Sequence, residues 1–127
     1  MKKYWKRFTT ILKVLCVILL LYTIIGGFLM PVPAKDILNE SIRNLYFHVP
    51  MWFCMICVLT YSCVTSILYL NNPVLKWDIM ASQSAHVGLL FAVIGFVTGA
   101  IWANYTWGAP WSNDIKQLCT VIALLVY

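Results

Sequence analysis

The composition of this 127-residue chain excludes a water-soluble globular protein. Hydrophobic residues make up 62% of the sequence and charged residues only 10%, whereas soluble domains carry roughly a quarter of charged residues. The net charge of +5 could by itself indicate a nucleic-acid-binding protein. Five of the nine basic residues, however, lie within the first thirteen positions, directly before an apolar run. This placement is typical of a membrane anchor and argues against nucleic acid as a partner.

The first apolar segment, about residues 11–30, predicts a transmembrane helix that is retained in the mature protein. Residues 14–30 carry no charge, and this stretch is longer than the usual apolar region of a secretory signal peptide. The sequence Pro31-Val32-Pro33-Ala34 after it matches a small-x-small cleavage site poorly. We therefore expect a multi-pass protein of the inner (cytoplasmic) membrane with a cytoplasmic N-terminus.

Two further segments, about 47–70 and 79–103, are long and apolar enough to span a bilayer. The connection 71–78 between them is short, polar and turn-like, so the two spans are predicted to form an antiparallel hairpin. Segments 31–46 and 104–116 then become loops on the outer face.

The basic residues agree with this topology. The predicted inner face holds the five N-terminal basic residues and Lys76, and the predicted outer face holds Lys35, Arg43 and Lys116. Six basic residues inside against three outside satisfy the positive-inside rule.

A fourth apolar segment, residues 117–127, is too short to span a bilayer. Its helix would rise about 16 Å, roughly half of the hydrocarbon thickness. We therefore expect residues 1–127 to form a single polytopic membrane domain with three transmembrane helices and the start of a fourth. We expect the class to be all-α and the chain to be an N-terminal fragment of a longer membrane protein; the alternative is a re-entrant end buried against a partner.

Two histidines are candidates for chemistry. His48 is placed at the outer end of the second span, two residues before a helix that Pro50 would open as a first-turn residue. Its neutral imidazole can ligate a metal or a haem iron, or it reaches the interface beside Tyr46 as a structural residue. His86 lies near the inner end of the third span beside residues 82–84, whose polar side chains favour interhelical hydrogen bonding. A functional role for His86 stays open.

The second predicted outer loop is rich in aromatic residues, with three Trp and one Tyr between positions 102 and 111. An interfacial aromatic belt accounts for one or two of them. Gly108 and Pro110 interrupt the helix and hold Trp107 and Trp111 on an irregular turn. Flat aromatic surfaces beside a polar turn suit a large planar apolar ligand, with indole N–H groups as donors. The residues alone support an interfacial aromatic belt and a ligand-binding site equally.

Two motifs in this order resemble the haem exporter protein C (CcmC) family and its CcsA-type relatives, haem-handling membrane proteins of cytochrome c maturation. One is Tyr46-Phe47-His48-Val49-Pro50 before a span, and the other is Trp107-Gly108-x-x-Trp111-x-x-Asp114, similar to the family pattern W-G-x-x-W-x-W-D. The similarity of segment order extends from about Val14 onward. The chain departs from the pattern at Asn113, where a third Trp is expected, and at Pro110, which replaces a bulky residue.

The resemblance implies a fold of six spanning helices, of which this chain would hold three and part of a fourth. It implies that His48 is an axial ligand to the iron of a non-covalently held b-type haem at the outer face. The second axial His would belong to a later outer loop, outside this chain. Trp107, Gly108, Trp111 and Asp114 would form the platform that holds the porphyrin. Candidate partners of the haem propionates are Arg43, Asn113 and Lys116.

The function implied by the resemblance is delivery of haem for cytochrome c maturation. Its partners would be haem, a haem chaperone, the lipid bilayer and other maturation subunits of the membrane, ABC-type subunits among them. The sequence offers no nucleophile–base pair and no nucleotide-binding loop, so we expect no enzyme activity. The alternatives are a transporter or channel subunit, hinted at by Gly26-Gly27 and by Gly95 and Gly99, or an assembly subunit whose Trp loop docks a partner protein.

Overall fold

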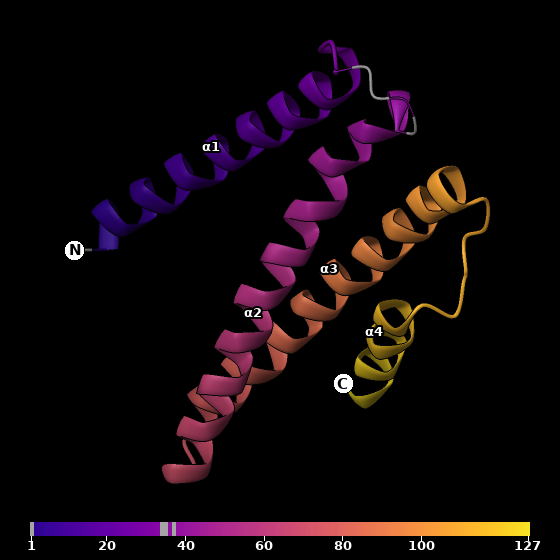
Figure 1. The fold of residues 1–127 in the computed structure, drawn as a ribbon. Coiled ribbons are helices and arrows are strands. Elements are labelled where there is room, and N and C mark those ends of the chain that lie inside the picture. The colour runs from indigo at the N-terminus through magenta and orange to yellow at the C-terminus, as the bar shows by residue number, and fades with distance from the viewer. Residues whose placement is uncertain (1, 34–35, 37) are drawn as a thin grey trace. The chain divides into compact units, whose positions relative to one another are not determined.

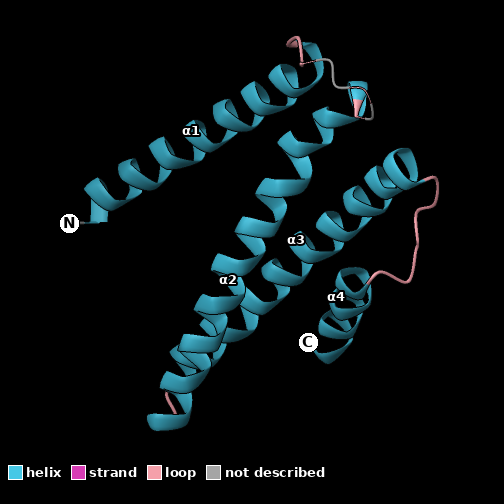
Figure 2. Cartoon of the chain, viewed as in Figure 1, coloured by secondary structure: helices cyan, strands magenta, loops and turns pink. Residues whose placement is uncertain are grey.

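The computed structural model describes residues 2–33, 36 and 38–127. All regular elements in these ranges are helices (Figures 1 and 2). In chain order they are α1 (Lys2–Leu29), the 3-10 helix η1 (Asn39–Asn44), α2 (Leu45–Asn71), α3 (Leu75–Trp107) and α4 (Ile115–Val126). The described residues contain three segments long and apolar enough to cross a membrane: Tyr4–Leu29, Asn39–Asn71 and Leu75–Trp107. The predicted all-α membrane class is confirmed.

The chain divides into two compact units, residues 1–33 and residues 34–127. The first unit contains α1, which begins at Lys2 rather than near residue 11 because no Pro or Gly interrupts the chain before Gly26. The second unit contains all the other helices. That residues 1–127 form one membrane domain stays a prediction. Lys35, assigned above to the outer face, lies outside the described residues.

The helical hairpin is tighter than the sequence predicts. α2 ends at Asn71 and α3 begins at Leu75, so three residues connect the helices instead of the segment 71–78. Asn72 is extended, with φ −146° and ψ 100°, because the ring of a following proline disfavours a helical conformation in the residue before it. Asp78 lies in the first turn of α3, where its negative charge is favourable beside the positive end of the helix dipole.

The third span is also longer than predicted. α3 continues through residues 104–107, which the sequence assigned to the outer loop. It ends only at Gly108, whose φ of 81° is left-handed and whose N–H donates to the carbonyl oxygen of Asn104. Glycine adopts this conformation without steric penalty, so the helix stops there rather than at the aromatic residues.

Small residues let α2 and α3 pack closely against each other. The buried positions of the two helices are Ser62, Thr65, Gly88, Ala92, Gly95 and Ala103. The Ser62 hydroxyl donates to the carbonyl oxygen of Ala81 across the helix pair at 2.8 Å. Such interfaces are typical of membrane helices, where apolar side chains gain nothing by leaving lipid for the protein interior.

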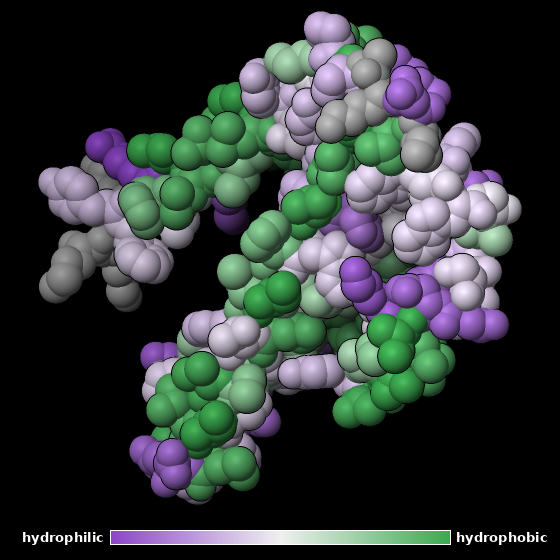
Figure 3. All heavy atoms as spheres, in the orientation of Figure 1, coloured by the Kyte–Doolittle hydropathy of each residue, from purple (hydrophilic) through white to green (hydrophobic). Residues whose placement is uncertain are grey.

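Large apolar side chains point away from this interface. Phe53 and Leu90 are 66% and 59% exposed. Figure 3 shows apolar surface over the middle of α2 and over α4. Burying this surface requires a lipid environment or further protein.

The close approach at Gly88 generates a test of the hairpin. A Cβ atom at this position would lie 2.4 Å from Cδ2 of Leu59, so we expect Gly88→Leu to lower the free energy of unfolding by about 1–3 kcal/mol through overpacking. The measurement is the unfolding of the micelle-embedded protein with increasing SDS. The control is Val87→Leu, on a side chain that is 45% exposed. Equal losses in the two variants would contradict this packing.

Candidate functional site

A pocket of about 810 Å³ lies at the end of the hairpin opposite the Asn72–Val74 turn. Its walls come from the start of α2, the C-terminal half of α3 and the first turns of α4. Three tryptophans and Phe96 line it together with a few polar groups: His48, Thr106, Asp114, Lys116, Gln117 and Thr120. This size and this mixture of aromatic walls with few polar groups are usual for small-molecule sites.

His48 belongs to α2 itself, which corrects the prediction that it precedes the helix. α2 begins at Leu45, so His48 is in its first turn and Pro50 follows two residues later, inside the helix. The sequence-based boundary is wrong because the helical backbone of η1 leads directly into α2, and Asn44 and Leu45 both adopt right-handed helical angles. Pro50 has no N–H to donate to the carbonyl oxygen of Tyr46, but the helix continues through it.

The hydrogen bonds of His48 determine its tautomer. Nδ1 lies 2.9 Å from the carbonyl oxygen of Gly95, which only accepts, so Nδ1 carries the proton and donates. Nε2 lies 3.1 Å from Nε1 of Trp52, which only donates, so Nε2 carries a lone pair and accepts. Both partners require the same neutral form. The nitrogen available for a metal is therefore Nε2, with its partner nitrogen held by a carbonyl as in many metal-binding histidines.

Both rings lie beside glycines of α3, and Gly99 makes room for the imidazole. A Cβ at Gly99 would lie 2.7 Å from Cε1 of His48, and a Cβ at Gly95 would lie 3.5 Å from Nε1 of Trp52. Trp52 and Trp102 meet the His48 ring edge-on, each with a centroid separation of 6.0 Å. The absence of a side chain at Gly99 therefore lets the imidazole of α2 pack closely against α3.

Trp102 carries a polar group without a partner. Its Nε1 is buried and has no hydrogen-bond partner among the described residues. A buried N–H donor left unpaired costs about 1–3 kcal/mol. Trp102 lines the pocket, so a ligand that brings an acceptor to this donor would remove the penalty.

The loop after α3 is braced from α4. The Gln117 side chain donates to the carbonyl oxygen of Pro110 at 3.1 Å and accepts from the N–H of Ser112 at 3.0 Å. Asp114 accepts from the N–H of Lys116 and caps α4, as short acidic side chains do at helix N-termini. These bonds hold the loop against the first turn of the helix that follows it.

The four residues of the predicted platform divide into two pairs. Trp107, the last residue of α3, lines the pocket and is 62% exposed, and Asp114 also lines the pocket. Gly108 and Trp111 lie outside the lining, Gly108 as the helix-ending residue. Trp111 packs beside Phe96, with ring centroids 6.3 Å apart, and Phe96 in turn lines the pocket.

Asn113, the departure from the family pattern, has a structural task in the loop. Its side-chain oxygen accepts from Nε1 of Trp111 at 2.6 Å. Its φ of 54° is left-handed, a conformation that asparagine tolerates better than most residues. Asn113 thus orients the Trp111 indole through its carbonyl oxygen.

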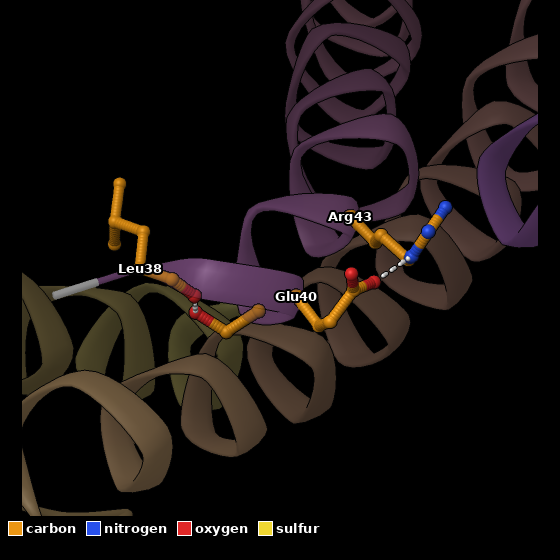
Figure 4. A network of polar contacts seen from close by, with 4 residues as sticks. Leu38, Glu40 and Arg43 are labelled. Carbon is orange, nitrogen blue, oxygen red and sulfur yellow. Dashed lines mark hydrogen bonds and ion pairs between the residues drawn. The ribbon is translucent and has the colours of Figure 1, made fainter. Parts of the chain in front are cut away.

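The two cationic candidates differ in their surroundings. Arg43 pairs with Glu40 on η1, with Nε and Oε2 2.6 Å apart (Figure 4), and it does not line the pocket. Lys116 lines the pocket and makes no ion pair with any described residue. Lys116 is therefore the better placed of the two for an anionic group of a ligand.

His86 lies away from this site. Its Nδ1 is 2.7 Å from the carbonyl oxygen of Ser82 one turn earlier in α3, and the residue is exposed. The interhelical hydrogen bond at this depth comes from Ser62 instead. Among the described residues, no group of three His, Cys, Asp or Glu side chains gathers as a metal site, so His48 would be a single protein ligand.

Sequence reasoning missed Trp52 and Gln117 as parts of the site, and it counted Trp102 among the aromatic residues 102–111 without assigning it to the haem platform. Trp52 follows His48 by four residues, which places both on one helix face, and this spacing was the available signal. Trp102 lies three residues after Gly99 on the face that meets His48. No local signal indicates that Gln117 closes the loop, because its partners lie five and seven residues earlier along an irregular segment.

Comparisons with known proteins agree on one family. A family model described as Heme exporter protein C matches residues 1–127. Heme exporter protein C of Paracoccus denitrificans is 29% identical over 104 residues, 82% of this chain and 42% of the relative. A putative cytochrome c biosynthesis ccmC-like mitochondrial protein of Marchantia polymorpha is 26% identical over 89 residues, 70% of this chain and 39% of the relative.

A cytochrome c biogenesis protein CcsA of Synechococcus is 36% identical over 64 residues, half of this chain and 20% of the relative. The chain thus spans less than half the length of these curated relatives. No solved structure matches it.

The contact between Gly99 and His48 generates a prediction. Gly99→Val places carbon where the imidazole lies, so we expect the ring to leave the Gly95 carbonyl and the unfolding free energy to fall by about 1–3 kcal/mol. The ¹⁵N signals of the imidazole report the loss of the Nδ1 hydrogen bond. Val97→Ile, on a side chain that is 50% exposed, is the control. Unchanged His48 signals in Gly99→Val would show that the two groups do not meet.

Proposed function

Because this chain belongs to the haem exporter protein C family, we propose that it binds haem as cargo in the pocket around His48, for use in cytochrome c maturation. The observation that carries the proposal is the state of His48. Its Nδ1–H is bound to the Gly95 carbonyl, and its Nε2 carries the lone pair, which accepts from Trp52 beside the pocket. A proton on Nδ1 and a lone pair on Nε2 are what an axial imidazole ligand of haem needs.

The ligand count at the site also favours haem over a bare metal ion. A bare zinc ion typically needs several protein ligands, and the described residues hold no such group. Haem iron brings its macrocyclic nitrogen ligands with it and needs only an axial ligand from the protein. One histidine inside an aromatic pocket therefore suits haem.

The remaining walls suit the rest of a haem molecule. Trp107 and Phe96 offer flat apolar surfaces for the macrocycle. Lys116 and the unpaired Nε1 of Trp102 are donors for the acidic propionates. In this proposal Asp114 positions the loop by capping α4, and Gly108 and Trp111 act through the loop's shape.

The membrane arrangement and the partners belong to the same proposal. The pocket opens at the outer face, the basic start of α1 stays in the cytoplasm, and the membrane is the inner membrane. Non-covalently held b-type haem passes from here to a haem chaperone, beside maturation subunits that include ABC-type proteins. The chain binds and relays its cargo rather than transforming it, so no residue is assigned a catalytic role.

A second candidate function is docking of a partner protein by the aromatic segment 102–114, which comprises the end of α3 and the loop after it. The observation that favours it is the exposure of Trp107 and Tyr105, 62% and 73%. Exposed aromatic side chains are common anchors in protein interfaces. Haem binding and docking do not exclude each other, and they separate experimentally.

The first test compares the two histidines of the chain. We expect His48→Ala to weaken haem binding by more than about tenfold, because even changes around a metal ligand typically weaken binding 10–100-fold. His86→Ala, on an exposed histidine that bonds only within α3, should leave binding unchanged. The measurement is a Soret-band titration of the detergent-extracted protein with haem. Equal binding by wild type and His48→Ala would overturn the proposal.

The second test separates cargo binding from docking. We expect Trp107→Ala to weaken haem binding about two- to tenfold, the value of one aromatic contact. Trp77→Ala, at the other end of α3, is the control. Haem titration and capture of the purified haem chaperone are measured in parallel. If capture fails in Trp107→Ala while haem binding matches the control, Trp107 belongs to the docking surface and not to the haem wall.

A further inference from the structure

We infer that Trp52 is a cap on the ligand nitrogen of His48, a positioning residue that must turn away before iron can bind. The inference rests on the proposed function and adds a step to it. It starts from one contact, the hydrogen bond from Trp52 Nε1–H to Nε2 of His48 at 3.1 Å.

The cap follows from the number of lone pairs. In the tautomer that the Gly95 carbonyl imposes, the ring has a single nitrogen lone pair in its plane, on Nε2. The Trp52 N–H occupies the direction of that lone pair. A coordination bond needs the same electrons along the same direction, so the hydrogen bond and the iron–nitrogen bond exclude each other.

The cap is built into one helix. His48 and Trp52 are four residues apart on α2 and therefore lie on the same face. Opening the cap needs only a side-chain rotation, with no shift of α2 against α3. The indole nitrogen also lies beside α3, 3.5 Å from where a Cβ of Gly95 would stand. Both side chains line the pocket, so the indole has open space beside it into which to turn.

The exchange is balanced without redox or proton transfer. The hydrogen bond from Trp52 to Nε2 breaks, and a dative bond from the Nε2 lone pair to the haem iron forms. Any weak ligand that the iron carried on that side leaves. Nδ1 keeps its proton and its bond to Gly95. The expected consequence is that the cap lowers the affinity of His48 for iron by the net value of one hydrogen bond.

The test is Trp52→Phe, which removes the N–H and keeps an aromatic ring. We expect haem to bind about two- to tenfold more tightly, the factor that one net hydrogen bond represents. Metal-free protoporphyrin has no iron to coordinate, so its affinity should be unchanged. The control is Trp77→Phe, which removes an indole N–H at the other end of α3, outside the pocket lining.

A second measurement uses no ligand. In the haem-free protein, the ¹⁵N signal of His48 Nε2 should shift in Trp52→Phe toward that of a nitrogen without a hydrogen bond. It should stay in place in haem-free Trp102→Phe, because Trp102 meets His48 at the same 6.0 Å centroid separation but makes no bond to Nε2. An unmoved Nε2 signal in Trp52→Phe would overturn the cap whether or not haem binds.

The outcomes separate the cap from the proposed function. If His48→Ala abolishes haem binding while Trp52→Phe binds haem no more tightly than wild type, the cap is wrong and the haem site stands. A parallel gain for haem and metal-free protoporphyrin would also overturn the cap, because Trp52 would then restrict the macrocycle rather than the iron. If wild type and all variants fail to bind haem, the proposed function itself falls.

Discussion

The hydrogen bond between His48 and the carbonyl oxygen of Gly95 is the contact on which the arrangement of the site depends. It joins the start of α2 to the C-terminal half of α3, and it forms only because Gly99 leaves space for the imidazole. Asn44 reinforces it by donating to the carbonyl oxygen of Thr98 at 2.8 Å. One nitrogen of the ring holds the helices together, and the other accepts from Trp52 in a side chain that lines the pocket. In the proposed function, His48 therefore has a structural and a chemical role at once.

Close helix packing is the condition for that bond, and its chemistry differs from that of a soluble core. Small residues occupy the buried positions of α2 and α3, while the large apolar side chains face outward. In a membrane this distribution is stable because lipid accepts the apolar side chains. The aromatic residues of the pocket are the exception, since Trp52 and Trp102 lie against His48 instead of lipid.

Much of the fold could be predicted from the apolar runs in the sequence, because the length of such a run is a strong signal for a spanning helix. The ends of the helices were less predictable. Aromatic residues after position 103 were assigned to a loop, yet only Gly108 ends the helix. His48 was identified as a chemistry-bearing residue, but Trp52 was not, since its hydrogen bond depends on rotamers. Gly99 makes room for His48 only because the two residues lie opposite each other in the α2–α3 pair. No local sequence pattern reveals which residues of the two helices lie opposite each other.

The single amide of Gln117 has a mechanical consequence. It holds Pro110 and Ser112 at once, and its own helix begins two residues earlier at Ile115. The irregular segment is therefore tied to the first turn of α4, and Gly108 is the only glycine with a left-handed φ in the described residues. Trp111 in this segment packs beside Phe96, which lines the pocket. A chain of contacts thus connects α4 with a residue in the same pocket lining as His48.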